Sequence, residues 1–331
     1  MSIQERFKNI TSSLTRVAVS VILLWVVFTR IDLDKTWGVL KSADISFVVY
    51  GALGFLLTTF IILGRWFIFI KALDISTTVM NVVRCFFVGL FGNLFLPTAI
   101  GGDVIKIIGL CQGSTQKAKV VASVVLDRLS GFGGISLVAL VAFALGYRYI
   151  GETSILVIIG LMLTGSVFGA AVLFNEKIYA FFCKAFYFIP KLQKSVMQMH
   201  YDIALLKDKK VTGFKTIGLS CITQLIYALV WYCIAISLHQ EISVIYFFIF
   251  VPIICVMSSF PSLGGLGVRE AGTAFLFTKV GVSPEAAVSM SLISYFYMVL
   301  VGILGGIIYV VTVPSGRTQH RSSSSFGDNT I

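Results

Sequence analysis

Residues 82–110 read VVRCFFVGLFGNLFLPTAIGGDVIKIIGL, an apolar stretch long enough to cross a membrane but interrupted in its middle. The interruption consists of Pro97 and the run Gly101-Gly102-Asp103. Proline removes a backbone donor and glycine weakens a helix, so a straight helix is not expected here. Broken backbone is tolerated at membrane depth only where protein or a watery cavity covers it. The stretch therefore predicts two half-helices or a re-entrant loop.

A second interrupted stretch covers residues 260–277. Its helix-breaking residues are Pro261, Gly264, Gly265 and Gly267. Their spacing resembles that in the first stretch, and a long hydrophobic segment follows each of the two stretches. Paired broken helices in two repeats, with a binding site between them, are typical of transporters. The pattern indicates an internal inverted repeat, with two unrelated kinks as the alternative.

The composition assigns the chain to the membrane. Of its 331 residues, 57% are hydrophobic and 12% are charged, about half the charged share of a soluble domain. The apolar stretches are continuous rather than alternating, which argues against a β-barrel. We predict an all-α polytopic membrane protein with about seven or eight transmembrane helices. Soluble, collagen-like, disordered, coiled-coil and nucleic-acid-binding classes are excluded.

A spanning helix needs about 20 mostly apolar residues. The clear candidates are Thr11–Phe28, Ile45–Leu63, Val120–Leu145, Ser154–Phe174, Thr216–Leu238, Ile242–Ser259 and Ala286–Val313. No small-residue cleavage site follows the first candidate, so we interpret it as an uncleaved anchor. With the broken segments 82–110 and 260–277, these helices predict one transmembrane domain over residues 1–313. Residues 314–331 are predicted to form a disordered tail.

The distribution of basic residues predicts the orientation. The net charge is +11, which indicates loops that face anionic lipid headgroups. The segments predicted to be cytoplasmic are the N-terminus, Gly64–Asn81, Lys106–Lys119 and Asn175–Lys215. Residues 175–215 include an amphipathic aromatic run that suits the membrane interface, with a solvated connector as the alternative. The basic tail also prefers the cytoplasm, which requires residues 260–277 to cross the membrane. A second re-entrant loop there would leave the tail outside.

Motifs of soluble enzymes are missing from the chain. It contains no zinc-protease helix motif, no phosphate-binding loop and no dinucleotide fingerprint. Its six cysteines form no CxxC motif and suit apolar packing. We therefore expect no metal, no cofactor and no ATPase activity of the chain's own.

The informative residues are ionisable groups within or beside the apolar stretches. They are Arg65, Arg84, Asp103, Lys106, Asp127, Arg128, Arg269 and Glu270. An isolated charge at the bilayer centre costs about 2.5–3.5 kcal/mol even on a lenient scale. Such groups therefore pair with one another or line a pathway.

Adjacent residues on a helix point about 100° apart, so neighbours in sequence should not pair. This applies to Asp127 and Arg128 and, if they are helical, to Arg269 and Glu270. The expected pairs are Asp127 with Arg269 or Arg84, and Arg128 with Glu270 or Asp103.

Structural roles stand beside a functional role for these charges. Asp127 and Arg128 could form ion pairs that only fasten helices, and Arg65, Lys106 and Arg84 could snorkel to the interface. On the functional interpretation, half-helix N-termini and arginine suit a phosphate. We predict anion cradles at residues 98–106 and 262–270. Asp103 would instead suit an amine, a sugar hydroxyl or a proton.

Four sequence blocks resemble a known family when taken in order. They are Gly64-Arg65-Trp66; Asn93-x3-Pro97-x3-Gly101-Gly102-Asp103-x2-Lys106; Ala122-Ser123-x3-Leu126-Asp127-Arg128-x2-Gly131; and Pro261-x2-Gly264-Gly265-Leu266-Gly267-Val268-Arg269-Glu270. They resemble the flippase-like membrane domain related to lysylphosphatidylglycerol synthase, found in bacteria and archaea. The resemblance covers about Gly64 to Ala271.

This resemblance implies a multi-helix lipid translocase fold with re-entrant elements. The positions that it implies to be functional are Arg65, Asp103, Asp127, Arg128, Arg269 and Glu270. Full synthases carry a large soluble C-terminal catalytic domain, which is not expected here, so lysyl transfer is not expected either. The run Ser294-Tyr295-Phe296-Tyr297 stands where family members often carry an arginine.

The preferred hypothesis is a flippase-like transporter, not an enzyme, in a prokaryotic inner (cytoplasmic) membrane with its N-terminus in the cytoplasm. It would move an anionic phospholipid or glycolipid headgroup between leaflets without its own ATPase. One alternative is a membrane transferase acting on a lipid-linked sugar or phosphate. Another is a non-catalytic protein that presents lipid to a glycosyltransferase or another lipid-modifying enzyme. No nucleic-acid partner is expected, and the oligomeric state stays open.

Overall fold

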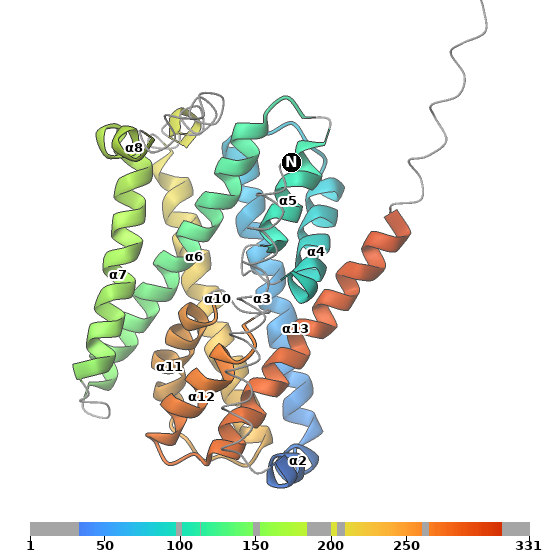
Figure 1. The fold of residues 1–331 in the computed structure, drawn as a ribbon, viewed down its shortest axis with the longest axis vertical. Helices are drawn as coiled ribbons and strands as arrows, with labels where there is room; N and C mark the ends of the chain where they lie inside the picture. The colour runs from blue at the N-terminus through green and yellow to red at the C-terminus, as the bar shows by residue number, and fades with distance from the viewer. Residues whose placement is uncertain are drawn as a thin grey trace, which may run out of the picture.

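The structure is a computed structural model that describes residues 33–96, 101–112, 114–147, 153–183, 200–203, 209–259 and 265–312. Within these residues the chain is helical and contains no strand (Figure 1). The predicted class, an all-α polytopic membrane protein, is confirmed. Several predictions fall outside the described residues: the helix Thr11–Phe28, the tail 314–331, Pro97, Pro261 and Gly264.

Five helices of the described chain are long and apolar enough to cross a membrane. They are α3 (Ile45–Ala72), α6 (Lys117–Gly146), α7 (Thr153–Phe174), α10 (Lys210–Ser237) and α13 (Pro284–Thr312). Helix α3 extends well past its predicted end at Leu63. A charged side chain just beyond that end would be costly if it faced lipid. Arg65 is instead buried and paired, so the helix continues without cost.

Each interrupted region forms two short helices. The first region gives α4 (Val79–Phe95) and α5 (Gly101–Cys111), and the second gives α11 (Val244–Met257) and α12 (Val268–Thr278). At 1.5 Å per residue, these helices are about 16 to 26 Å long, less than the ~30 Å hydrocarbon core. The α4–α5 pair lies in the upper half of Figure 1 and the α11–α12 pair in the lower half. Each pair enters the bundle and returns to the end from which it came, as a re-entrant element does.

Glycines allow α4 and α5 to pack tightly. A Cβ on Gly102 would lie 2.3 Å from the backbone oxygen of Gly89, so only glycine fits at this contact. The Gly102 N–H donates to Asn93 Oδ1 at 2.7 Å and joins the two helices across the turn. The glycines that weaken the helix therefore also allow the hairpin to close.

The second region differs from the prediction. Residues Ile242–Ser259 are predicted to span the membrane, but they form α11, a helix of 14 residues that contains Pro252. The re-entrant element is therefore Val244–Thr278, not residues 260–277 alone. After α12 the chain crosses once, through α13 (Figure 1). The described part of residues 260–277 is one half of a re-entrant hairpin whose other half is α11, so this segment does not cross the membrane by itself. The side of the membrane on which the tail lies stays a prediction.

The two regions form an inverted repeat. Helices α3, α4, α5 and α6 have 28, 17, 11 and 30 residues. Helices α10 to α13 have 28, 14, 11 and 29. Helices α3 and α10 are antiparallel, because Asp44 N donates to Ser237 O at one end and Lys209 Nζ donates to Ala72 O at the other. The two units thus run through the bundle in opposite directions, as the sequence indicated.

The two ends of the bundle differ in charge. One end carries described segments 71–79, 111–119, 174–183, 200–203 and 209–215, including α8 (Glu176–Cys183), with seven lysines and three acidic residues. The other end carries segments 33–45, 237–244 and 278–285, including α2 (Leu33–Lys41), with three lysines and four acidic residues. We call these the basic end and the opposite end. The predicted cytoplasmic loops, where described, gather at the basic end.

Candidate functional site

Five charged side chains meet in the half of the bundle nearer the basic end. They are Arg65 on α3, Asp103 and Lys106 on α5, and Asp127 and Arg128 on α6. We call them the basic-end cluster. The α4–α5 hairpin carries Asp103 and Lys106 into the bundle, where they meet side chains from both neighbouring long helices.

Asp103 accepts from two cations. Lys106 Nζ lies 3.2 Å from Asp103 Oδ1, one turn along α5, and Arg128 Nε lies 2.5 Å from Asp103 Oδ2. The Asp103 side chain is 4% exposed. Of the two partners predicted for Arg128, Asp103 is confirmed, and Glu270 pairs elsewhere. A buried carboxylate is stable here because both of its oxygens are paired with cations.

Asp127 binds a partner that the sequence did not indicate. Arg65 Nε donates to Asp127 Oδ1 at 2.7 Å, and Arg65 Nη1 donates to Ser220 Oγ of α10 at 2.8 Å. The predicted partners, Arg269 and Arg84, are wrong. Arg269 belongs to the hairpin in the other half of the bundle, and Arg84 is partly exposed with no hydrogen bond or ion pair to another described residue.

Lys106 and Arg65 point into the protein rather than toward the interface. Each side chain is 8% exposed, so snorkelling is excluded for both. The Lys106 ammonium lies over aromatic rings, 4.7 Å from the Phe86 centroid and 5.5 Å from the Trp66 centroid. A desolvated cation is stabilised by such ring faces. Trp66 is held in turn by a 3.2 Å hydrogen bond from Nε1 to Ser123 Oγ.

The charges of the basic-end cluster do not balance. Three cations face two carboxylates, which leaves a net charge of +1 in the ionised state. The most exposed member of the cluster is Arg128, whose side chain is 44% exposed and whose Nε is bonded to Asp103. Arg128 lies well inside a membrane-spanning helix. Its exposed face therefore lies at membrane depth, where a negatively charged group would be stabilised.

Arg269 and Glu270 form a closed group in the other half. Arg269 Nη2 lies 2.7 Å from Glu270 Oε1, and Ser291 of α13 links the two by accepting from Arg269 Nε and donating to Glu270 Oε1, each at 2.9 Å. The side chains are 7% and 0% exposed. We call Arg269 and Glu270 the α12 pair. It has no net charge, and both of its charged groups are bonded to other residues of the protein.

The expectation that Arg269 and Glu270 do not pair is wrong for a local reason. They lie in the first turn of α12, where Glu270 folds back and Oε2 accepts from Gly267 N at 2.6 Å. Gly267 adopts a φ of 85°, which favours glycine. The Glu270 carboxylate thus occupies the half-helix N-terminus where the sequence predicted a phosphate. In the described part of the cradle predicted at 262–270, the chain's own carboxylate therefore occupies the donor at Gly267 N.

Helix α10 supplies polar residues that the sequence analysis missed. Ser220, Gln224 and Tyr227 follow one another at intervals of four and three residues, so they share one face of the helix. Ser220 binds Arg65, and Tyr227 Oη lies 3.3 Å from Ser294 Oγ of α13. We call these three residues the α10 stripe. The signal was present as regularly spaced polar residues in an apolar helix, but none of them carries a charge.

Gln224 is the polar midpoint of this stripe. Its side chain is buried, at 4% exposed, and its Nε2 has no hydrogen-bond partner among the described residues. An unsatisfied buried donor costs about 1–3 kcal/mol. Gln224 thus presents a free donor between the basic-end cluster and α13, where a ligand or water oxygen would satisfy it.

Comparisons with known proteins agree with this architecture. A family model described as the lysylphosphatidylglycerol synthase TM region matches residues 13–306. A UPF0104 membrane protein of Pyrococcus horikoshii is 26% identical to this chain, with 88% of the chain and 93% of that protein covered. No solved structure matches.

Proposed function

The chain belongs to the family of lysylphosphatidylglycerol synthase transmembrane regions, and from this premise we propose that it is a lipid translocase. It moves an anionic phospholipid or glycolipid headgroup between leaflets, without an ATPase of its own and without chemical change to the lipid. One observation carries this proposal: the basic-end cluster has a net charge of +1, and its most exposed member, Arg128, lies on a membrane-spanning helix.

A phosphate-bearing headgroup fits the cluster best. Arginine offers several planar donors that match phosphate oxygens, and such charge-assisted bonds are about twice as strong as neutral ones. A half-exposed guanidinium at membrane depth is costly when it faces hydrocarbon alone. An anionic headgroup beside Arg128 would neutralise the surplus, whereas a neutral headgroup would leave it in place.

The α10 stripe is the proposed path for the headgroup beyond the cluster. Ser220 contacts Arg65 of the cluster, and Tyr227 contacts α13 of the second repeat, with Gln224 between them. The headgroup follows these polar groups while the acyl chains stay in lipid. Inverted repeats around such a path support alternating access from the two sides. By the positive-inside rule, we place the basic end in the cytoplasm of a prokaryotic cell.

A vesicle assay tests the proposal. The purified protein is reconstituted with phosphatidylglycerol that carries a fluorescent nitrobenzoxadiazole group, and dithionite is added outside. Dithionite bleaches only the outer leaflet of protein-free vesicles, so we expect the protein to expose the inner-leaflet probe as well. Arg128→Gln should lose this effect. Bleaching by wild-type vesicles that stops at the level of protein-free vesicles would overturn the proposal.

A further inference from the structure

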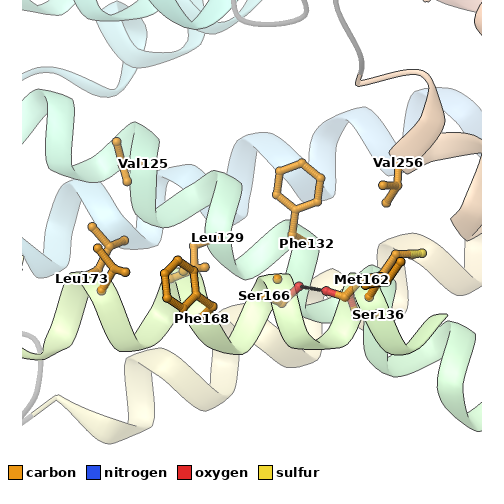
Figure 2. A pocket seen from close by; sticks show the side chains of 13 residues that line it. Val125, Leu129, Phe132, Ser136, Met162, Ser166, Phe168, Leu173 and Val256 are labelled. Carbon is orange, nitrogen blue, oxygen red and sulfur yellow. Dashed lines mark hydrogen bonds between the residues drawn. The ribbon is translucent and has the colours of Figure 1, made fainter. Parts of the chain in front are cut away.

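The structure contains an apolar groove of about 620 Å³ between α6 and α7. Val125, Leu129 and Phe132 of α6 form one wall, and residues of α7 from Leu161 to Leu173 form the other (Figure 2). The polar atoms at the groove are already engaged, because Ser136 Oγ lies 3.0 Å from Ser166 Oγ, which donates to Met162 O at 2.9 Å. The groove therefore offers hydrocarbon contacts.

The length of the groove matches the thickness of one lipid leaflet. Its wall on α6 extends over eleven residue steps, from Val125 to Ser136, or about 16 Å. Half of the hydrocarbon core is about 15 Å thick. The α7 wall reaches Leu173, next to the basic end. The exposed side chains of Leu161 and Phe168, 69% and 55% exposed, belong to the groove lining, so it opens toward lipid.

The groove lies next to the charged cluster on α6. On α6, Arg128 lies within about 60° of the face formed by Val125, Leu129 and Phe132, at 100° per residue. Its side chain is 44% exposed and its Nε is bonded to Asp103 of α5, so Arg128 borders the groove without lining it. Positive charge at the edge of an apolar, leaflet-length groove matches a molecule with an anionic headgroup and a hydrocarbon chain.

We infer that this groove holds an acyl chain of the anionic phospholipid whose phosphate the basic-end cluster binds. The inference rests on the proposed function and adds where the lipid sits before it crosses: in the leaflet at the basic end, against α6 and α7. Gly165 keeps the groove open, because a Cβ there would meet no atom within 4 Å. A larger side chain at this position would enter the space without striking the protein.

Photolabelling tests the inference. Wild-type protein is placed in phosphatidylethanolamine vesicles with a trace of phosphatidylglycerol that carries a diazirine in one acyl chain. The control probe is phosphatidylcholine with the same chain. Labelled peptides are identified by mass spectrometry after irradiation. We expect the phosphatidylglycerol probe to label the groove residues of α6 and α7 more strongly than the phosphatidylcholine probe does.

Two variants on one helix give the matched comparison. Gly165→Phe should lower groove labelling by about fivefold, because its ring takes the space of the chain. Gly160→Phe should label like wild type, because Gly160 also has open space at its Cβ but does not line the groove. Gly165→Leu, with a smaller side chain in the same space, should lower groove labelling less than Gly165→Phe does. Arg128→Gln should reduce phosphatidylglycerol labelling to the phosphatidylcholine level.

The outcomes separate this inference from the proposed function. Equal labelling by both probes, or labelling that Gly165→Phe leaves unchanged, would mean that the probes label lipid surrounding the protein without selectivity. Either result would overturn the inference, even if the vesicle assay shows transport. Selective labelling blocked by Gly165→Phe would support the groove even if dithionite shows no transport, and the translocase proposal alone would then fail.

Discussion

The two re-entrant hairpins have the same scaffold but hold their charges differently. Each lies between two long helices and contributes an 11-residue half-helix with charged residues in its first turns. The first hairpin joins the basic-end cluster, which has a net charge of +1 and an arginine side chain 44% exposed. The second holds the α12 pair, which is neutral and at most 7% exposed. An inverted repeat can therefore supply one scaffold twice while the two copies hold their charged side chains differently.

This comparison assigns different roles to charges of the same kind. A buried, fully bonded pair fixes how segments pack, and removing one partner leaves an uncompensated charge. A cluster with surplus charge at a surface can accept a further anion. We therefore expect substitutions in the α12 pair to damage folding, and substitutions at Arg128 to damage lipid handling.

The largest expected effect is on stability, from Arg269→Ala. This change leaves the Glu270 carboxylate buried without its cation and should cost about 3–5 kcal/mol. Thermal unfolding in detergent, followed by tryptophan fluorescence and size-exclusion chromatography, measures the loss. The double variant Arg269→Met, Glu270→Gln should recover most of it. If Arg269→Ala unfolds at the wild-type temperature but moves no lipid, the α12 pair is functional, and the claim that its role is only structural is wrong.

The next effect is on transport, from Arg128→Gln. Asp103 keeps Lys106 but loses the cation at Oδ2, so the free energy of unfolding should fall by about 1–3 kcal/mol, less than for Arg269→Ala. Loss of a charge-assisted bond to the headgroup should slow lipid movement about tenfold or more. The dithionite assay measures the transport rate. Arg128→Lys keeps the charge without the planar donors, so its rate should lie between those of wild type and Arg128→Gln. A destabilised protein with normal transport would reverse the assigned roles.

A smaller effect is expected on headgroup preference, from Lys106→Met. Asp103 keeps Arg128 as its partner, and the net charge of the cluster falls from +1 to zero. The preference for phosphatidylglycerol over phosphatidylcholine should fall by about fivefold, the equivalent of ~1 kcal/mol. Comparing dithionite rates for the two fluorescent lipids measures this ratio. A ratio that stays unchanged would remove the surplus charge as the source of selectivity.

The smallest effect is expected from Gln224→Leu, and its sign on stability is opposite to that of Arg269→Ala. The change removes an unsatisfied buried donor, so unfolding should stay the same or become harder by about 1 kcal/mol. Lipid movement should slow by a factor of about two to three, because the headgroup loses one donor on its path. Lipid binding at the basic-end cluster should stay as in wild type. Faster lipid movement in Gln224→Leu than in wild type would mean that the headgroup does not follow the α10 stripe.

The sequence predicted the class, the family, the presence of two broken regions, and Asp103 as one of two partners for Arg128. The broken regions were predictable because glycine and proline act on local backbone. The family resemblance is confirmed by the match over residues 13–306. The pair of Arg65 with Asp127 was missed because the two residues lie 62 positions apart, and only helix packing brings them together. Sequence spacing cannot report such a contact.

Other errors arose from treating segments as regular helices. Arg269 and Glu270 pair because they lie in a first turn, where a side chain folds back to cap the helix. The stretch Ile242–Ser259 is apolar enough to span but forms one half of a hairpin, and its apolar residues are covered by protein rather than lipid. Ser220 and Gln224 were missed because a neutral polar residue stands out less than a charge in an apolar segment.

Native mass spectrometry of bound lipid tests the central claim most directly. Wild type, Arg128→Gln and the double variant Arg269→Met, Glu270→Gln are purified in the same mild detergent from the same host. We expect one anionic lipid class to be enriched on wild type, lost from Arg128→Gln and retained by the double variant. Bulk lipid on wild type, or equal loss from both variants, would contradict a binding site confined to the basic-end cluster.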